Sequence, residues 1–160
     1  MSEDTEIEMV DISWEQFHKD CRALVKKLIK VGNFKKMVAV TRGGLFPAGV
    51  IAREMEIRDI DTICIASYDE YSQGKLTLVK PSMIEGDGEG VLFVDDLVDT
   101  GRTIEFIKQK YPKAHIATVY AKEHGKHLVD TYVSMMDCWV LFPWEGCMQP
   151  ATPMIKNGRK

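Results

Sequence analysis

The chain has 160 residues, enough for one compact domain with a core of its own, and we expect a single domain over residues 1–160. Its composition, with 45% hydrophobic and 28% charged residues, is that of an ordinary globular protein rather than a disordered or disulfide-rich one. A formal net charge of -3 argues against the broad basic surface of a sequence-independent nucleic-acid binder, so no nucleic-acid partner is expected.

The cysteines and the apolar segments indicate a cytosolic protein. None of the four cysteines lies in a C-x-x-C pair, and no signal-peptide pattern precedes them, which favours reduced thiols in the cytoplasm and argues against a cysteine metal site. No apolar run approaches the ~20 residues needed to cross a bilayer, so any membrane association is expected to be peripheral.

The first third of the chain predicts a lead-in, a helix and then a strand–loop–helix unit. Residues 1–10 are polar and acidic, and we expect them to be mobile. Ser13 and Gln16 fit a capping box, and the apolar residues after them recur at helical spacing until Gly32. Residues 37–41 form a short β-branched apolar run, followed by the loop Arg42-Gly43-Gly44 and a helical pattern over residues 47–55.

The rest of the chain alternates in the same way. The polar segment that links the second and third strands suggests a mobile hairpin or lid, assigned to residues 68–80, and residues 85–90 form a glycine-rich turn. The fully apolar run at 91–94 is typical of a parallel sheet. Strands are predicted at 60–67, 76–79, 91–94, 115–121 and 138–142, and a helix at 103–110.

This alternation of strands and helices predicts an α/β fold with an open, mostly parallel sheet. Such sheets bind ligands at the carboxyl ends of their strands. The loops that follow Thr41, Val94 and Ala121 are therefore the candidate positions for chemistry.

The loop after the apolar strand at 91–94 combines two kinds of ligand group. Asp95, Asp96 and Asp99 supply carboxylates, which accept hydrogen bonds from sugar hydroxyls and bind Mg²⁺. The segment Thr100-Gly101-Arg102-Thr103 opens a helix whose amides and hydroxyls suit a phosphate dianion. The pattern indicates a site for a ribose 5-phosphate with a metal nearby, and an acidic turn with a helix cap is the alternative. The sequence contains no P-loop and no dinucleotide fingerprint after its first strand.

Three other features complete a possible site. Arg42-Gly43-Gly44 offers a cation and exposed amides, although an ordinary turn has the same sequence. Lys122, at the end of the strand 115–121, can donate to the 6-oxygen of a purine, or can be a solvated surface lysine. Trp139 can stack on a base, with the backbone near Val140 reading the base edge, or can belong to the core.

The string Val91-Leu-Phe-Val-Asp-Asp-Leu-Val-Asp-Thr-Gly-Arg-Thr103 resembles the phosphoribosyl diphosphate (PRPP) signature of the type I phosphoribosyltransferases. Further motifs in the same order, among them Val-Thr-Arg-Gly-Gly-Leu-x-Pro and Cys-Trp-Val-x-x-Pro-Trp, are similar to the bacterial xanthine-guanine members over about residues 10–145. The resemblance implies the type I phosphoribosyltransferase fold, an open, mostly parallel twisted sheet flanked by helices, with a small base-binding hood over residues 136–160.

The resemblance also implies an activity and its site. The expected reaction transfers the 5-phosphoribosyl group of PRPP to N9 of guanine, xanthine or hypoxanthine, with Mg²⁺ as cofactor, in a homotetramer that is cytoplasmic and in some members loosely bound to the inner membrane. It also implies a cis peptide at Arg42–Gly43. Matched to the family pattern position by position, Arg42 and Gly43 are expected to bind pyrophosphate, and Asp96 is expected to bind the magnesium. The ribose is expected to contact Asp95 and Asp96, and the 5-phosphate is expected to contact Thr100, Gly101, Arg102 and Thr103. The residues expected to bind the base are Asp99, Lys122, Trp139 and Val140, with Asp99 also handling the base proton.

Three departures from the family pattern affect these expectations. Gly74 stands where a loop arginine contacts PRPP, and Lys75 is its expected replacement as a point charge without the bidentate fork. Arg102 stands where a glycine is usual, and Leu141 and Phe142 replace polar residues. Two other functions stay open: a non-catalytic PRPP-sensing regulator, and a pyrimidine or adenine enzyme of the same fold, which Lys122 and Trp139 disfavour.

Overall fold

The computed structural model describes residues 8–67, 74–146 and 153–157. The elements in chain order are β1 (Met9–Asp11), α1 (Trp14–Val31), β2 (Lys36–Thr41), α2 (Leu45–Glu54), β3 (Asp59–Ser67), β4 (Leu76–Lys80), β5 (Val91–Val98), α3 (Arg102–Lys110), β6 (His115–Ala121), the 3-10 turn η1 (Lys126–Leu128), β7 (Ser134–Met135), β8 (Trp139–Leu141) and α4 (Met154–Asn157).

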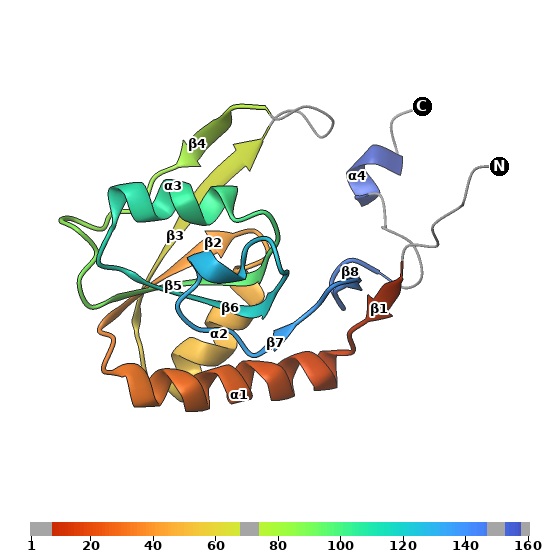
Figure 1. Cartoon of the computed structure of the whole chain (residues 1–160), viewed down its shortest axis with the longest axis horizontal. Helices are drawn as coiled ribbons and strands as arrows, with labels where there is room; N and C mark the ends of the chain where they lie inside the picture. Colours follow the sequence, from red (N-terminus) through yellow and green to blue (C-terminus); the bar gives the residue numbers. More distant parts are fainter. Residues whose placement is uncertain (1–7, 68–73, 147–152, 158–160) are drawn as a thin grey trace.

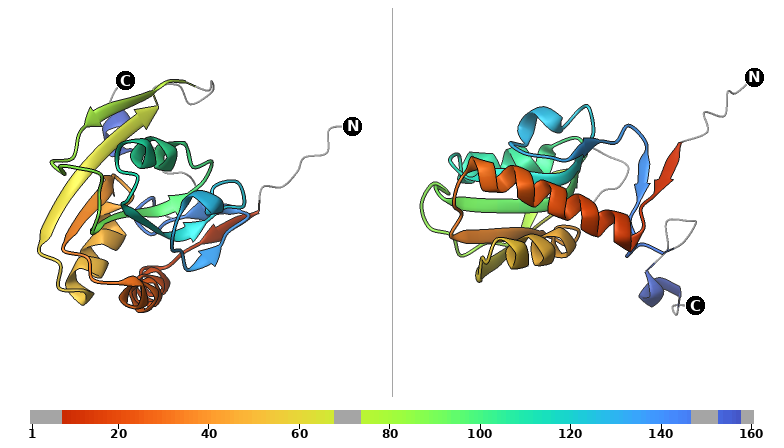
Figure 2. Two further views of the ribbon diagram at one scale, coloured as in Figure 1. Left: turned by 60° about the vertical axis from the view of Figure 1, so that its left-hand side comes forward. Right: turned by 90° about the horizontal axis from the view of Figure 1, so that it is seen from below.

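A six-stranded sheet forms the centre of the molecule, with the strand order β4-β3-β2-β5-β6-β7. All neighbouring strands are parallel except β3 and β4, which are antiparallel. Helices α1 and α2 cover one face of this sheet and α3 covers the other (Figures 1 and 2). The predicted open, mostly parallel sheet flanked by helices is confirmed.

The apolar strands are explained by burial on both faces of the sheet. In β2, Met37 and Ala39 pack into the cluster that contains the buried faces of α1 and α2, whereas Val38 and Val40 pack into the cluster that contains α3. Consecutive residues point to opposite faces of a strand, so a strand covered on both sides is apolar at every position.

The helix signals of the sequence agree with the structure to within a few residues. The Ser13 hydroxyl accepts a hydrogen bond from the Gln16 amide at 3.1 Å and caps α1, and Gly32 follows the last helical residue. Helix α3 begins at Arg102. The largest boundary difference is in β5, which continues to Val98 because its pairing with β6 extends to Ala121, although polar residues 95 and 96 suggested a loop.

The two ends of the chain meet in a small second sheet, which the sequence did not indicate. Strand β1 pairs in parallel with β8, with Met9 opposite Trp139 and Asp11 opposite Leu141. The two strands lie beside each other away from the main sheet (Figure 1). The expectation of a mobile lead-in is therefore wrong for its last two residues, and positions 1–7 lie outside the described residues.

An aromatic stack attaches the chain just after β8 to the helices. The Trp144 ring lies 4.0 Å from the Phe46 ring and 4.5 Å from the Phe142 ring, centroid to centroid, and is nearly parallel to both. Trp144 also makes a T-shaped contact with the Phe17 ring of α1, with the centroids 5.0 Å apart. These contacts connect the chain beyond β8 to α1 and to the start of α2.

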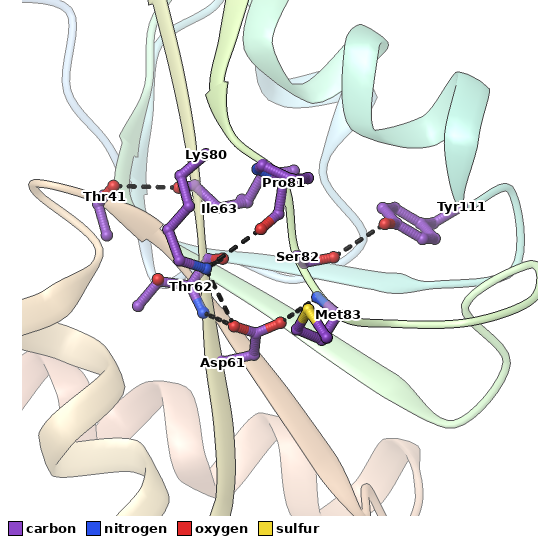
Figure 3. A network of polar contacts seen from close by, with 9 residues as sticks. All are labelled: Thr41, Asp61, Thr62, Ile63, Lys80, Pro81, Ser82, Met83 and Tyr111. Carbon is purple, nitrogen blue, oxygen red and sulfur yellow. Dashed lines mark hydrogen bonds and ion pairs between the residues drawn. The ribbon is translucent and has the colours of Figure 1, made fainter.

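Strands β3 and β4 form a hairpin whose base is held by a polar network (Figure 3). Lys80 Nζ donates to Asp61 Oδ1 at 3.2 Å and to the Thr62 carbonyl at 2.8 Å. The other Asp61 oxygen accepts from the Met83 amide. Residues 76–80 of the predicted mobile loop therefore form a paired strand, while residues 68–73 of that prediction lie outside the described residues.

Candidate active site

The loops that follow β2, β5 and β6 meet at the carboxyl edge of the sheet, where the sequence predicted the chemistry. A cavity of about 150 Å³ lies in the loop after β5 and is lined by Asp95, Leu97, Val98, Asp99, Thr100, Gly101, Arg102, Thr103 and Ile104. A second hollow of about 540 Å³ lies by the end of α2 and the beginning of β3. The smaller cavity is the candidate site because it coincides with the predicted phosphate loop.

The geometry of this loop suits an anion. Gly101 has a φ of 85°, in the left-handed region that favours glycine, and it precedes the first residue of α3. No side chain caps this helix, so the cavity faces a positive helix end whose first amides are directed to it. Thr100 and Thr103 add hydroxyl groups to the lining.

Asp95 and Asp96 form a pair of partly buried carboxylates in the second half of β5. Asp95 Oδ1 accepts from the Asp96 amide at 2.9 Å, and Asp96 Oδ1 accepts from the Leu97 amide at 2.7 Å. Burial, followed by repulsion from Asp96, raises the pKa of Asp95 well above its usual value, and burial also raises the pKa of Asp96. Neither is in an ion pair among the described residues.

These two carboxylates fit a divalent cation. Mg²⁺ binds one or two carboxylates in sites that handle phosphates and keeps several waters. The described residues contain no group of three or more His, Cys, Asp or Glu side chains that would form an all-protein metal cage. A metal at this place would therefore be shared between the carboxylate pair, water and a bound ligand.

The loop after β2 lies against this pair. A Cβ on Gly43 would lie 2.6 Å from the Asp96 Cγ, so glycine is needed for the close approach of the two loops. Arg42 is exposed beside it. The cis peptide is Thr41–Arg42, one bond earlier than expected at Arg42–Gly43; neither bond precedes a proline, so the sequence did not distinguish them.

Asp99, Lys122 and Trp139 form a second group next to the cavity. Lys122 Nζ lies 3.6 Å from Asp99 Oδ2 and 5.7 Å from the centre of the Trp139 ring, so the lysine is located between them. The Trp139 side chain is 48% exposed, which argues against the core alternative for this residue. Val140 is buried. Lys122 has these two partners and is not simply a solvated surface lysine.

The position of Trp139 depends on a residue that the sequence did not single out. The Trp139 amide donates to the carbonyl of Glu8 at 2.8 Å, and the parallel pairing of β1 with β8 continues from there. The N-terminal segment thus holds the backbone of the aromatic residue. A single sequence contains no signal for a pairing between segments separated by about 130 residues.

Gly125 supports Asp99 from the loop after β6. A Cβ on Gly125 would lie 2.6 Å from Val98 Cγ2 and 3.2 Å from the Asp99 carbonyl carbon. Only a glycine lets the two loops pack this closely. Gly125 directly precedes η1, and a single glycine in a polar loop is not a recognisable motif, so the sequence did not indicate this contact.

The predicted PRPP-contacting residue Lys75 is exposed and lies between Gly74 and β4. Its neighbour Gly74 accepts a hydrogen bond of 2.6 Å from Arg102 Nη2, so the phosphate loop contacts the β3–β4 hairpin directly. The family resemblance implied a phosphate-binding position for Arg102 and did not indicate this second partner.

The site thus combines a cavity at the start of a helix, a carboxylate pair on the preceding strand and a glycine loop against that pair, the arrangement expected for a transferase that binds a ribose phosphate. Residues 13–151 match the family of the Phosphoribosyl transferase domain. The chain belongs to the phosphoribosyltransferase family.

Within this family, the chain is similar to proteins named xanthine-guanine phosphoribosyltransferase. The chain is 52% identical over 147 residues to the xanthine-guanine phosphoribosyltransferase of Desulfotalea psychrophila, covering 90% of this chain and 91% of that protein. It is 45% identical over 161 residues to the protein of the same name from Chromohalobacter salexigens, covering 99% and 98%. The solved xanthine-guanine-hypoxanthine phosphoribosyltransferase of Helicobacter pylori superimposes with a TM-score of 0.76 at 26% identity, covering 94% of this chain and 97% of that one.

The structure also bears on the membrane expectation. Among the described residues, no helix has both the length and the apolar character needed to cross a bilayer.

Proposed function

We propose that the protein is a purine salvage enzyme that transfers the 5-phosphoribosyl group of PRPP to N9 of a 6-oxopurine. The acceptors are guanine, xanthine and hypoxanthine, and the products are GMP, XMP or IMP together with pyrophosphate. The observation that carries the proposal is the cluster of Asp99, Lys122 and Trp139 directly beside the phosphate cavity. The names of the two curated relatives support it.

The two ends of PRPP have separate binding places in this proposal. The 5-phosphate enters the cavity at the start of α3, where Thr100, Gly101, Arg102 and Thr103 donate to it. Pyrophosphate lies against Arg42 and Gly43 at the end of β2, with Lys75 approaching from the hairpin. The ribose hydroxyls between these two places donate to Asp95 and Asp96.

Magnesium is the proposed cofactor, with Asp96 as its ligand. Asp96 lies between the ribose and pyrophosphate places, because its carboxylate is in contact range of Gly43. When bound there, the metal supplies positive charge to the pyrophosphate leaving group. Burial and repulsion disfavour two unpaired negative charges on Asp95 and Asp96. A bound cation would offset this cost, so the carboxylate pair suits a metal ion.

The base lies between Trp139 and the phosphate loop. Trp139 stacks on its face, Lys122 donates to the 6-oxygen, and the backbone of Val140 contacts its edge. During transfer, N9 forms a bond to C1′ of the ribose and the bond from C1′ to pyrophosphate breaks. The proton displaced from the purine ring passes to the Asp99 carboxylate, which acts as a general base.

The test is turnover with each base in the presence of PRPP and Mg²⁺. Nucleotide formation from at least one 6-oxopurine, and none from adenine or a pyrimidine, is expected. Asp99→Asn should lower kcat/KM by about 10² to 10⁴, the range of a general base. Glu105→Gln is the matched control, since it removes one exposed carboxylate from the first turn of α3 and should retain wild-type turnover.

Absence of turnover with all three 6-oxopurines would exclude the proposed reaction. Wild-type turnover by Asp99→Asn would remove the assigned role of this residue. The comparisons give no support to the alternative, a PRPP-sensing regulator without catalysis.

The assembly and location form part of the proposal. A homotetramer in the cytoplasm, with at most peripheral contact with the inner membrane, is expected from the family resemblance. Light scattering coupled to size-exclusion chromatography measures the mass in solution; a mass near one 18.2 kDa chain would contradict the tetramer.

A further inference from the structure

Arg102 joins two loops that the proposed function assigns to different phosphates of PRPP. It is the first residue of α3, is partly buried, and lines the cavity for the 5-phosphate. Its Nη2 also donates to the Gly74 carbonyl at 2.6 Å. Gly74 precedes β4 by two residues and is next to Lys75, the cation assigned to pyrophosphate.

A guanidinium group can donate to the Gly74 carbonyl and to an anion in the cavity at the same time. It has five N–H donors in a rigid, planar fork, and the bond to Gly74 uses one of them. The other donors are left for an anion in the cavity. The volume of about 150 Å³ corresponds to roughly five water molecules, which is sufficient for a phosphate group.

The β3–β4 hairpin is held at two points, and the contact between Arg102 and Gly74 is the one next to Lys75. At its base the hairpin is held by Lys80, which contacts Asp61 and the Thr62 carbonyl (Figure 3). At the Gly74 end, the bond from Arg102 ties the hairpin to α3. A carbonyl held at Gly74 restricts the backbone from which Lys75 projects.

We propose that Arg102 is a positioning residue that couples recognition of the 5-phosphate to the placement of Lys75 for a pyrophosphate group. The ligand class is a ribose 5-phosphate that carries a diphosphate on C1′. This inference rests on the proposed function for its ligand, but not on which base is the acceptor.

The test compares PRPP with ribose 5-phosphate, which has the same 5-phosphate but no pyrophosphate. Dissociation constants are measured by isothermal titration calorimetry with Mg²⁺ and without a base. Lys75→Ala should weaken PRPP binding roughly tenfold and leave ribose 5-phosphate within about twofold. Arg102→Ala should weaken both ligands, with a loss about tenfold larger for PRPP.

The double variant Arg102→Ala/Lys75→Ala provides the decisive measurement. Lys75 is already misplaced when Arg102 is absent, so removing it then should change PRPP binding by less than about twofold. Arg102→Lys keeps the charge without the fork, and should retain ribose 5-phosphate binding while losing most of the advantage for PRPP. Arg53→Ala removes an exposed guanidinium from α2 and serves as the control.

Two outcomes would overturn the inference. If Arg102→Ala weakens the binding of both ligands equally, and its effect on PRPP binding adds to that of Lys75→Ala in the double variant, the arginine acts only as a cation for the 5-phosphate. If Arg102→Ala binds both ligands like the wild type, the contact with Gly74 has no role in recognition. Failure of the proposed function appears differently, as wild-type protein that binds PRPP but converts no 6-oxopurine.

Discussion

Gly44 offers a stability test of the close packing under the site. It lies at the N-terminal end of α2, with a φ of -65° that any residue adopts, so only space requires glycine here. An added Cβ would lie 2.5 Å from the Val40 carbonyl oxygen and closer still to that of Val94. Real Cβ atoms keep at least 3.0 Å, so the backbone of two central strands would have to move by about half an ångström.

Gly44→Ala should therefore destabilise the protein. Overpacking against backbone costs about 1–3 kcal/mol. Weakening the 2.9 Å bond from the Gly44 amide to the Val40 carbonyl adds about 0.5–1.5 kcal/mol. For a chain of this length, the combined effect corresponds to a drop of roughly 5–15 °C in the melting temperature.

Gly49 is the matched control for this experiment. It lies in the same helix and is exposed, and an added Cβ would meet nothing within 4 Å. Gly49→Ala should raise stability by about 0.5–1 kcal/mol through helix propensity. Thermal unfolding followed by circular dichroism measures both variants. A Gly44→Ala protein that melts with or above the wild type would refute the packing argument.

Two further predictions concern residues outside the site. Burial lowers the pKa of His115 in the folded protein below 6.5. The neutral imidazole therefore contributes fully to stability above the pKa that His115 has in the unfolded chain, and this contribution is lost as the pH falls through the lower pKa of the folded state. His115→Gln should accordingly lose less unfolding free energy than the wild type between pH 7.5 and 5.5 in urea titrations; equal losses would contradict this. Tyr120 donates to Asp20 at 2.6 Å, and Tyr120→Phe should cost about 1–3 kcal/mol; an unchanged urea midpoint would show that the bond contributes nothing.

Local chemistry explains why so much of the fold was predictable. Strands buried on both faces are apolar throughout, as residues 91–94 show, and Ser13 and Gly32 mark helix ends through hydrogen bonds made within a few residues. The candidate phosphate loop was equally visible, because its carboxylates, glycine and threonines are contiguous in the chain.

Contacts between distant segments were not predictable in the same way. The pairing of β1 with β8, which holds Trp139, involves extended segments of three residues with no periodic pattern of their own. Strand β5 continues through Asp95 and Asp96 because β6 pairs with it, although carboxylates rarely suit a strand. The position of the cis peptide and the approach of Gly125 to Asp99 likewise depend on neighbouring loops.

The sequence by itself determined the class of fold, the position of the candidate phosphate loop and the residue types that surround it. Motifs and hydrophobic periodicity are local properties of the chain, so they can be recognised in the sequence alone. Only the tertiary structure decided that Lys122 lies between Asp99 and Trp139, and that Arg102 contacts Gly74. Such distances depend on how strands and loops pack across the sheet, and on backbone positions that no single segment specifies.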